Sequence, residues 1–388
     1  MQRSTERILT THVGSLVRPP EIMALMEAKA KGLSAPQSQF DATVSKAVAE
    51  VVQKQAAVGI DIVSDGEYAK INFAGYVGDR LSGFEQRETP PGESPINNFG
   101  RDHLAFPEFY AAYDVAPVSG GRTRVVAVSP IKQIGHDLIQ SDITNLRGAV
   151  EDTNVVEAFI PSVAPATVEG QRRNEFYSTT EEYLYAIGDA MHEEYKAIVD
   201  AGFLLQIDDP RIVAQYDLMD PAPSIEDYRK FAELRVEVIN HAIGDIPPDR
   251  IRYHLCWGSW HGPHSTDLPL RDIIDVVLKI RAGAYSVEAA NARHEHEWRV
   301  WEDVKLPDGK ILIPGVVGHV TNTIEHPELV AMRIENFARL VGRENVIAGT
   351  DCGFSQGSLN PRVHSTIMWA KLRTLAEGAH LASQRLWR

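Results

Sequence analysis

The sequence predicts an α/β protein that folds as a single (β/α)8 barrel, or TIM barrel, over residues 1–388. Short apolar runs rich in β-branched residues alternate with longer amphipathic stretches, which is typical of parallel strands connected by helices. The runs number eight, and each is nearly continuous in hydrophobicity, as expected when both faces of a sheet are covered. A chain of 388 residues accommodates one such barrel with insertions.

The expected strands are spaced along the whole chain and end in polar residues. They are 7–13, 59–65, 155–163, 203–209, 251–256, 284–291, 311–317 and 345–352. Apolar residues at i, i+3 and i+4 predict helices at 40–58, 180–201, 224–243 and 326–342. Ser224 and Thr180 are the expected N-caps, and Gly202 and Gly342 the expected helix ends.

Residues 85–130 interrupt the alternation of strands and helices. The stretch "ETPPGESPINNFGRDH" is rich in Pro, Gly and Asn, which predicts an irregular excursion rather than a second domain. The apolar run "RTRVVAVSPI" at 122–131 can pair with part of it. We therefore expect one catalytic domain with an insertion.

Composition and charge exclude several classes of partner. The chain has 39 basic and 53 acidic residues, a net charge of −14, which argues against a nucleic acid and against an anionic membrane surface. No apolar run approaches 18 residues, and the first residues lack the apolar core of a signal peptide. We expect a cytoplasmic protein acting on small molecules, and homo-oligomerisation stays open.

Polar side chains concentrate where the expected strands end, in "THVGS", "SDGE", "QIDDP", "HLC", "VEAAN" and "GTDC". The carboxyl ends of barrel strands meet on one face, where such folds keep their active sites. A polar residue at one strand end is often only a turn former. Six strand ends that carry Asp, Glu, His or Cys favour a functional site.

Four of these residues form a coherent ligand set for Zn²⁺. His254 and Cys256 are two apart on an expected strand, so their side chains leave on the same face. Glu288 ends the next strand and Cys352 the last. Zinc accepts nitrogen, oxygen and sulfur donors in a tetrahedral arrangement. In a reducing compartment the only two cysteines are better read as ligands or free thiols than as a disulfide.

Other groupings are weaker alternatives. The stretch "NARHEHEW" at 291–298 carries two histidines and two glutamates, but it leads into an expected helix, where such residues are usually solvated. Two more histidines, His261 and His264, follow Cys256 in the same loop. A carboxylate rim can also bind a hard cation. Its members would be His12, Asp61, Asp65, Glu67, Asp208 and Asp209.

With "THVGSLVRP", "DGE", "IDDP", "HLC" and "GTDCGF" in this order, the chain resembles the catalytic barrel of the cobalamin-independent methionine synthase family over nearly its whole length. The resemblance implies a zinc-dependent transfer of a methyl group to the thiol of homocysteine, from a donor of the 5-methyltetrahydrofolate type. Its zinc ligands match His254, Cys256, Glu288 and Cys352.

The resemblance also assigns the substrate and proton-transfer residues. Glu67 and Asp208 match the partners of the homocysteine ammonium, and Ser15 matches a residue near its carboxylate. The family's proton-donating histidine corresponds to His319 in "GVVGHV", which lies one place early, and His12 is the second choice.

Two departures leave alternatives open. "FIPSVAPATVEG" lacks a tryptophan that the family associates with folate, and "EHPELVAMRIENFARL" is also similar to a short-chain branch that includes epoxyalkane:coenzyme M transferases. That branch would add a thiol to an epoxide, with a cation such as Arg18 for a sulfonate. A non-catalytic zinc or small-molecule binding protein is the third alternative.

Overall fold

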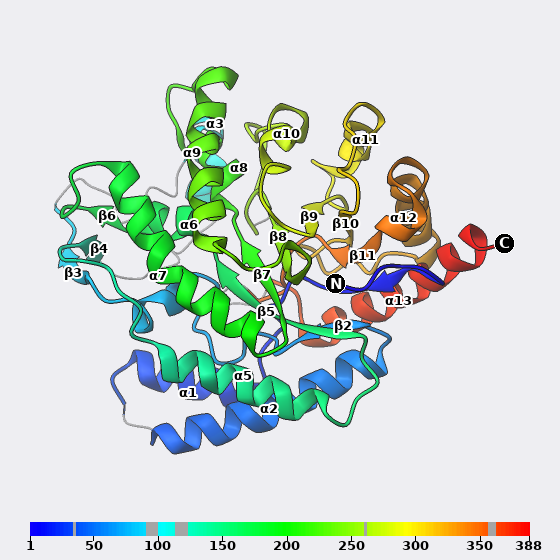
Figure 1. Ribbon diagram of the computed structural model, residues 1–388, viewed down its shortest axis with the longest axis horizontal. Coiled ribbons are helices and arrows are strands. Elements are labelled where there is room, and N and C mark those ends of the chain that lie inside the picture. Colours follow the sequence, from blue (N-terminus) through cyan, green and yellow to red (C-terminus); the bar gives the residue numbers. More distant parts are fainter. Residues whose placement is uncertain (34–35, 91–99, 113–122, 260–261, 356–361) are drawn as a thin grey trace.

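The computed structural model describes residues 1–388 except 34–35, 91–99, 113–122, 260–261 and 356–361. Helices surround a central sheet of parallel strands (Figure 1). The strands are β1 Leu9–Thr10, β2 Ile62–Ser64, β3 Phe84–Glu88, β4 Thr123–Ala127, β5 Glu157–Val163, β6 Arg173–Asn174, β7 Leu204–Asp208, β8 Ile251–His254, β9 Ala284–Glu288, β10 Ile311–Val317 and β11 Ile347–Thr350.

The helices between them range from one turn to six. The α-helices are α1 Pro20–Ala30, α2 Gln37–Ala57, α3 Arg101–Ala105, α4 Pro107–Ala112, α5 His136–Val150, α6 Pro165–Gln171, α7 Thr180–Asp200, α8 Arg211–Leu218, α9 Ile225–Ile243, α10 Ile274–Val277, α11 Val300–Asp303, α12 Pro327–Val341 and α13 Ser365–Leu386. Short 3-10 helices lie at Gly75–Asp79, Pro248–Arg250, Leu270–Asp272, Glu295–Arg299 and Arg343–Asn345.

Eight strands close into a barrel, so the prediction of a TIM barrel is confirmed. Their order is β1-β11-β10-β9-β8-β7-β5-β2, with parallel pairing throughout. A parallel bridge between Thr11 and Ile62 joins the two ends of this order. All eight coincide with the apolar runs expected to be strands, although most are shorter. Each is buried on both faces almost throughout, which explains their continuous hydrophobicity.

The interior of the barrel changes from apolar to polar along its axis. Eight buried apolar side chains fill one end: Leu9, Ile62, Phe159, Leu204, Ala284, Ile311, Ile313 and Ile347. Next to this layer the guanidinium of Arg252 lies 4.1 Å from the centre of the Phe159 ring. It donates to Thr11 Oγ1 and to the carbonyl of His12, both at 2.8 Å. The polar layers lead toward the carboxyl ends of the strands.

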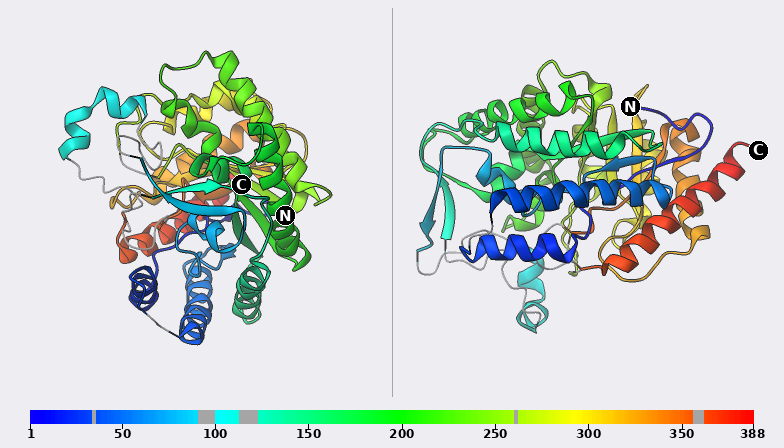
Figure 2. Two further views of the ribbon diagram at one scale, coloured as in Figure 1. Left: turned by 90° about the vertical axis from the view of Figure 1, so that its left-hand side faces the viewer. Right: turned by 90° about the horizontal axis from the view of Figure 1, so that it is seen from below.

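The excursion pairs as the sequence suggested. β4 pairs antiparallel with β3, and β6 extends the pair into a three-stranded sheet outside the barrel. The excursion also carries α3 and α4. Figure 2 shows α1, α2 and α5 side by side along another flank of the barrel.

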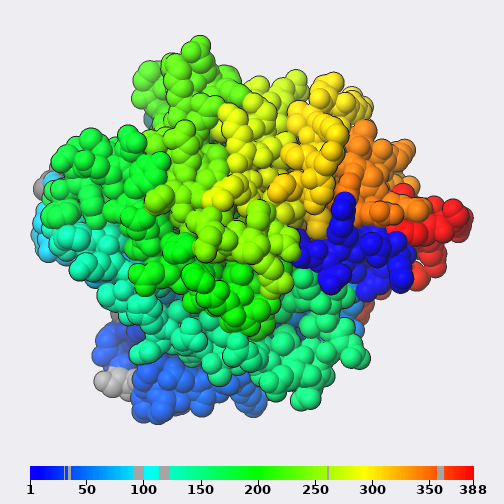
Figure 3. All heavy atoms as spheres, in the orientation of Figure 1, coloured from blue at the N-terminus to red at the C-terminus, as the bar shows by residue number. Residues whose placement is uncertain are grey.

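The chain ends meet on the surface of the molecule. In Figure 3 the first residues lie beside the C-terminal helix α13. Ser383 Oγ accepts from the backbone N–H of Ile8 at 2.9 Å, and the indole of Trp387 donates to the carbonyl of Thr5 at 3.0 Å. In the part of the chain that the structure describes, no helix is long and apolar enough to cross a bilayer.

The expected helix ends hold with one correction. Ser224 caps α9 by accepting from the backbone N–H of Asp227 at 3.1 Å. The N-cap of α7 is Thr179 rather than Thr180, because the Thr179 hydroxyl accepts from the backbone N–H of Glu182 at 3.0 Å. Gly202 follows the end of α7 and Gly342 ends α12, both with positive φ.

Candidate active site

The nine predicted site residues all lie at or just beyond the carboxyl ends of barrel strands, and all are buried. They are His12 and Ser15 after β1, Glu67 after β2, Asp208 on β7, His254 on β8 with Cys256 just after it, Glu288 on β9, His319 after β10 and Cys352 after β11. This is the face of a TIM barrel on which active sites are built.

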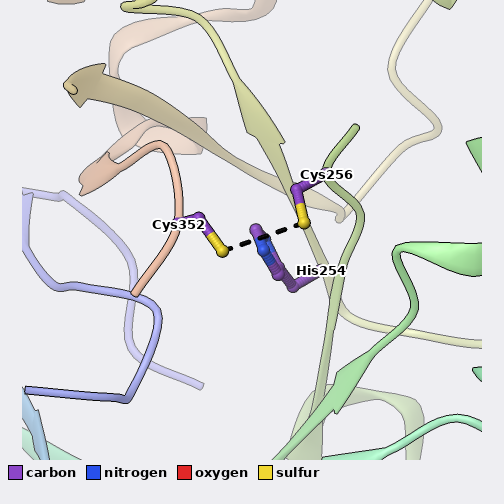
Figure 4. A group of neighbouring side chains, drawn as sticks. All are labelled: His254, Cys256 and Cys352. Carbon is purple, nitrogen blue, oxygen red and sulfur yellow. Dashed lines mark hydrogen bonds between the residues drawn. The ribbon is translucent and has the colours of Figure 1, made fainter. Parts of the chain in front are cut away.

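Three of the four expected zinc ligands form one cluster. Donor atoms of His254, Cys256 and Cys352 all lie within 4.8 Å of one another. Figure 4 shows the two sulfurs facing each other beside the His254 ring, with Cys352 reaching the cluster from a different segment. The end of β8 and the residues just after it thus supply His254 and Cys256, two residues apart as predicted, and the loop after β11 supplies Cys352.

The geometry of the cluster fits zinc. The two Sγ atoms are 3.8 Å apart, and two Zn–S bonds of about 2.3 Å at a tetrahedral angle would separate the sulfurs by about 3.8 Å. His254 Nδ1 lies 3.3 Å from Ser286 Oγ, while its Nε2 is buried with no hydrogen-bond partner among the described residues. In a zinc-bound histidine, one ring nitrogen typically binds the metal and the other forms a hydrogen bond.

The two thiols differ in acidity. Their mutual hydrogen bond lowers the pKa of Cys352 well below its ordinary value, and the neighbouring His254 and His319 act in the same direction. The same hydrogen bond, together with burial, raises the pKa of Cys256. A bound cation would favour the ionised form of both cysteines.

Glu288, the fourth expected ligand, is adjacent to this cluster and not part of it. In the parallel pairing of β8 with β9, Arg252 is opposite Ala284 and His254 opposite Ser286. Two residues further on, the same register brings Cys256 level with Glu288. Burial, together with neighbouring negative groups, raises the pKa of Glu288 well above its ordinary value.

The two candidate proton donors have different surroundings. His12 Nε2 donates to Gln55 Oε1 at 2.6 Å, and its Nδ1 accepts from the backbone N–H of Gly14 at 3.1 Å. His319 is also buried, but neither of its ring nitrogens has a hydrogen-bond partner among the described residues. Burial lowers the pKa of each to about 4. The geometry favours His319 as the residue that meets a ligand and His12 as a structural residue.

The expected ammonium site is a pair of buried carboxylates. Burial raises the pKa of Glu67 to about 7, an effect that Lys70 and Arg18 partly offset. Burial and the charge of Glu67 raise the pKa of Asp208 well above its ordinary value. Glu67 also adopts a φ of 58°, a left-handed conformation that is strained for a side chain of this size. Such strain is common in binding sites.

Ser15 lies against the loop that carries Cys352. A Cβ atom on Gly353 would lie 2.0 Å from Ser15 Oγ, so only glycine allows this approach. The backbone N–H of Ser355 reaches the same hydroxyl at 3.4 Å. Ser15 therefore joins the loop after β1 to the loop after β11, next to a metal-cluster residue.

Sequence similarity extends over the whole chain, although no family model matches it. A methionine synthase from Thermococcus kodakarensis is 22% identical over 380 residues, covering 98% of this chain and 94% of the relative. A methionine synthase from Sulfurisphaera tokodaii is 22% identical over 380 residues, covering 97% and 93%.

A solved structure shares the fold. It is a B12-independent methionine synthase from Shewanella sp. W3-18-1 in complex with selenomethionine, with a TM-score of 0.72 and 18% identity, covering 98% of this chain and 99% of that chain. The resemblance to cobalamin-independent methionine synthases is confirmed.

The rival groupings do not form metal sites in the described residues. The ring of His294 is held between Glu297 at 2.9 Å and Asp267 at 3.0 Å, and it stacks on Trp257 at 3.8 Å between ring centroids. His264 lies 2.9 Å from the same Asp267 carboxylate. His261 lies outside the described residues.

Sequence reasoning missed Lys70. Its ammonium donates to the carbonyl of Pro161, and it lies 4.5 Å from the centre of the Tyr76 ring. Its charge favours ionisation of Glu67 and Asp208. The only sequence signal is a lysine three residues after Glu67, a spacing that is common in any loop.

Proposed function

We propose that the protein is a zinc-dependent methyltransferase that converts homocysteine to methionine. The observation that carries this proposal is the cluster of His254, Cys256 and Cys352, whose donor set suits zinc. The methionine synthases among its relatives support the same reaction.

The carboxylate pair gives the site a second recognition element. When bound, zinc supplies the positive charge that keeps the homocysteine sulfur a thiolate, the form that attacks a methyl group. Glu67 and Asp208 bind the substrate ammonium, which relieves the repulsion between them. We assign to the Ser15 hydroxyl a hydrogen bond donated to the substrate carboxylate. In this proposal the site binds both the thiol end and the amino-acid end of homocysteine.

In this proposal His319 is the general acid that protonates the departing nitrogen of the methyl donor. A methyl group leaves a tertiary amine such as 5-methyltetrahydrofolate only if the departing nitrogen gains a proton. Burial keeps the imidazole of His319 neutral at pH 7, with a pKa of about 4. An anionic methyl donor bound beside the ring would favour the imidazolium form, which could then pass its proton to the nitrogen.

One observation favours homocysteine over a sulfonate thiol. Arg18, the cation that a sulfonate would need, is buried and already committed to protein oxygens. Its Nη2 donates to the carbonyls of Glu67 and Lys70 at 2.9 and 2.7 Å, and its Nη1 donates to Ser355 at 3.1 Å. Arg18 is therefore not free to bind a sulfonate, whereas Glu67 and Asp208 suit an ammonium.

The test combines metal analysis with an activity screen. The purified protein is expected to contain zinc and to form methionine from homocysteine with 5-methyltetrahydrofolate, its polyglutamate or a simpler methyl donor. Excess coenzyme M is expected to leave the rate unchanged. Turnover of coenzyme M with an epoxide would favour the alkyltransferase alternative. Zinc without turnover of any thiol, and without a change in coordination when a thiol is added, would favour a binding protein.

A further inference from the structure

The two carboxylate oxygens of Glu288 have different surroundings. Oε2 accepts a hydrogen bond from Nδ2 of Asn291 at 2.8 Å. Oε1 is buried and has no hydrogen-bond partner among the residues that the structure describes. A buried carboxylate oxygen without a partner is costly. One oxygen is therefore held by the protein, and the other is left for a ligand.

The orientation of Asn291 is itself fixed. Its Oδ1 accepts from the backbone N–H groups of Arg293 at 3.0 Å and His294 at 2.9 Å. Because this oxygen is used by the turn, the amide nitrogen must face Glu288. Asn291 thus couples a turn of the backbone to the position of one carboxylate oxygen.

Asp351 connects the loop of Glu288 to the loop of Cys352. It directly precedes Cys352 and is fully buried. Its Oδ1 accepts from the backbone N–H groups of Ala289 at 2.7 Å and Ala290 at 2.8 Å. Two loops that carry expected metal ligands are joined through this single carboxylate, on strands that are not neighbours in the barrel.

The strand β10 lies between those two loops, and a glycine in it allows Asp351 to reach the loop after β9. On β10, Gly315 pairs with Glu288 of β9 and with Gly349 of β11. A Cβ atom at position 315 would lie 2.5 Å from the Cα of Asp351. A glycine here lets Asp351 lie across β10 and reach the backbone of the β9 loop.

We propose that Asn291 and Asp351 are positioning residues for the metal centre. Asn291 holds Oε2 of Glu288 so that Oε1 remains available to the metal, and Asp351 fixes the distance between the loops of Glu288 and Cys352. Residues that hydrogen-bond to metal ligands generally determine affinity by orienting them. This inference rests on the proposed zinc site and adds residues that neither the metal cluster nor the sequence pattern identified.

The test separates the Glu288 contact from the turn. Asn291→Asp keeps an oxygen for the backbone of the turn but replaces the donor that faces Glu288 with a second oxygen. Zinc affinity, measured by competition with a chromophoric chelator, is expected to fall roughly 10- to 100-fold. The visible spectrum of the cobalt-substituted protein is expected to shift. Asp351→Asn, which retains the Oδ1 acceptor, is expected to change affinity less than Asp351→Ala.

A double-mutant comparison decides between positioning and a general structural effect. Adding Asn291→Asp to Glu288→Ala is expected to change zinc affinity by no more than about twofold, because Glu288, the nearer of the two carboxylates to which Asn291 Nδ2 donates, is already gone. Circular dichroism and melting temperature check that each variant folds. The inference would be overturned if Asn291→Asp bound zinc as tightly as the wild type, or if it lowered zinc affinity equally in the wild-type and Glu288→Ala proteins. Neither result would contradict the zinc site itself. A wild-type protein that binds no zinc would overturn both.

Discussion

The two sides of the barrel mouth are both buried and polar, but they are prepared for ligands in opposite ways. The metal side comprises His254, Cys256, Glu288, His319 and Cys352. In the described structure His254 Nε2, Glu288 Oε1 and both ring nitrogens of His319 have no hydrogen-bond partner. On the carboxylate side, burial raises the pKa of Glu67 and of Asp208, and the charge of Glu67 raises the pKa of Asp208 further. One side offers atoms that suit a metal such as zinc, and the other offers carboxylates that suit an ammonium.

The difference shows how one small molecule can be recognised at both ends. Unpaired nitrogen, oxygen and sulfur atoms gain most from a metal ion. Crowded carboxylates gain most from a positive group that restores their charges. In the proposed function, a thiol that carries an ammonium a few bonds away, such as homocysteine, binds to both sides at once.

The largest expected effect comes from removing a metal-side sulfur. Cys352→Ala should lower zinc affinity and methyl transfer by roughly two orders of magnitude or more, because a ligand and its thiolate charge are both lost. Elemental analysis and a methionine-forming assay measure this. Methionine binding on the carboxylate side, followed by calorimetry, should fall far less. Equal losses on both sides would show that the two sides are not separable.

The next largest effect concerns the proton donor. His319→Asn is expected to lower kcat by roughly 10²- to 10⁴-fold, the usual range for a general acid, while zinc content stays the same. Steady-state kinetics with the methyl donor identified by the screen measures this.

His12→Asn provides the matched control for His319. Its ring is already bonded to Gln55 and Gly14, so this variant is expected to lower the melting temperature and to change kcat by less than about tenfold. If His12→Asn lost more activity than His319→Asn, the assignment of the proton donor would be reversed.

A smaller effect is expected on the carboxylate side. Glu67→Gln and Asp208→Asn should each weaken methionine binding by about 10- to 100-fold, as expected when an ammonium loses a charged hydrogen-bond partner. Zinc content should be unchanged. Isothermal calorimetry with methionine, which has no thiol, isolates this side from the metal. Unchanged affinity in both variants would refute the ammonium site.

The smallest effect is a pH dependence. Because the pKa of Glu67 in the free protein is about 7, an ammonium must displace a proton from it at lower pH. Methionine affinity should therefore rise as pH increases through about 7, by up to about tenfold per pH unit for each carboxylate that must lose a proton. Glu67→Gln should flatten this profile. A wild-type profile that is already flat would contradict the shifted pKa.

Much of the fold was predictable because barrel strands are local features. Apolar runs such as 311–317 and 251–256 coincide with β10 and β8, and the polar residues after them lie on one face as the topology requires. The pair His254 and Cys256 was predictable from the alternation of side chains along a strand. The sequence also predicted that the run 122–131 can pair with part of the excursion, but it did not identify β3 as the partner strand.

Contacts between distant segments could not be predicted. Nothing near His12 in the sequence indicates that its Nε2 forms a hydrogen bond with Gln55, 43 residues away. Lys70 next to the two carboxylates, and Asp351 across β10 from the loop of Glu288, likewise depend on how the barrel closes. The pattern identifies residue types at strand ends, whereas tertiary packing decides which of their atoms remain unpaired.

Zinc K-edge absorption of the purified protein, with and without homocysteine, tests the central claim most directly. The account predicts a zinc ion with two sulfur neighbours from Cys256 and Cys352 in the free protein and a third sulfur when homocysteine binds. Homocysteine that binds with no added sulfur neighbour, or a folded protein that takes up no zinc, would contradict it.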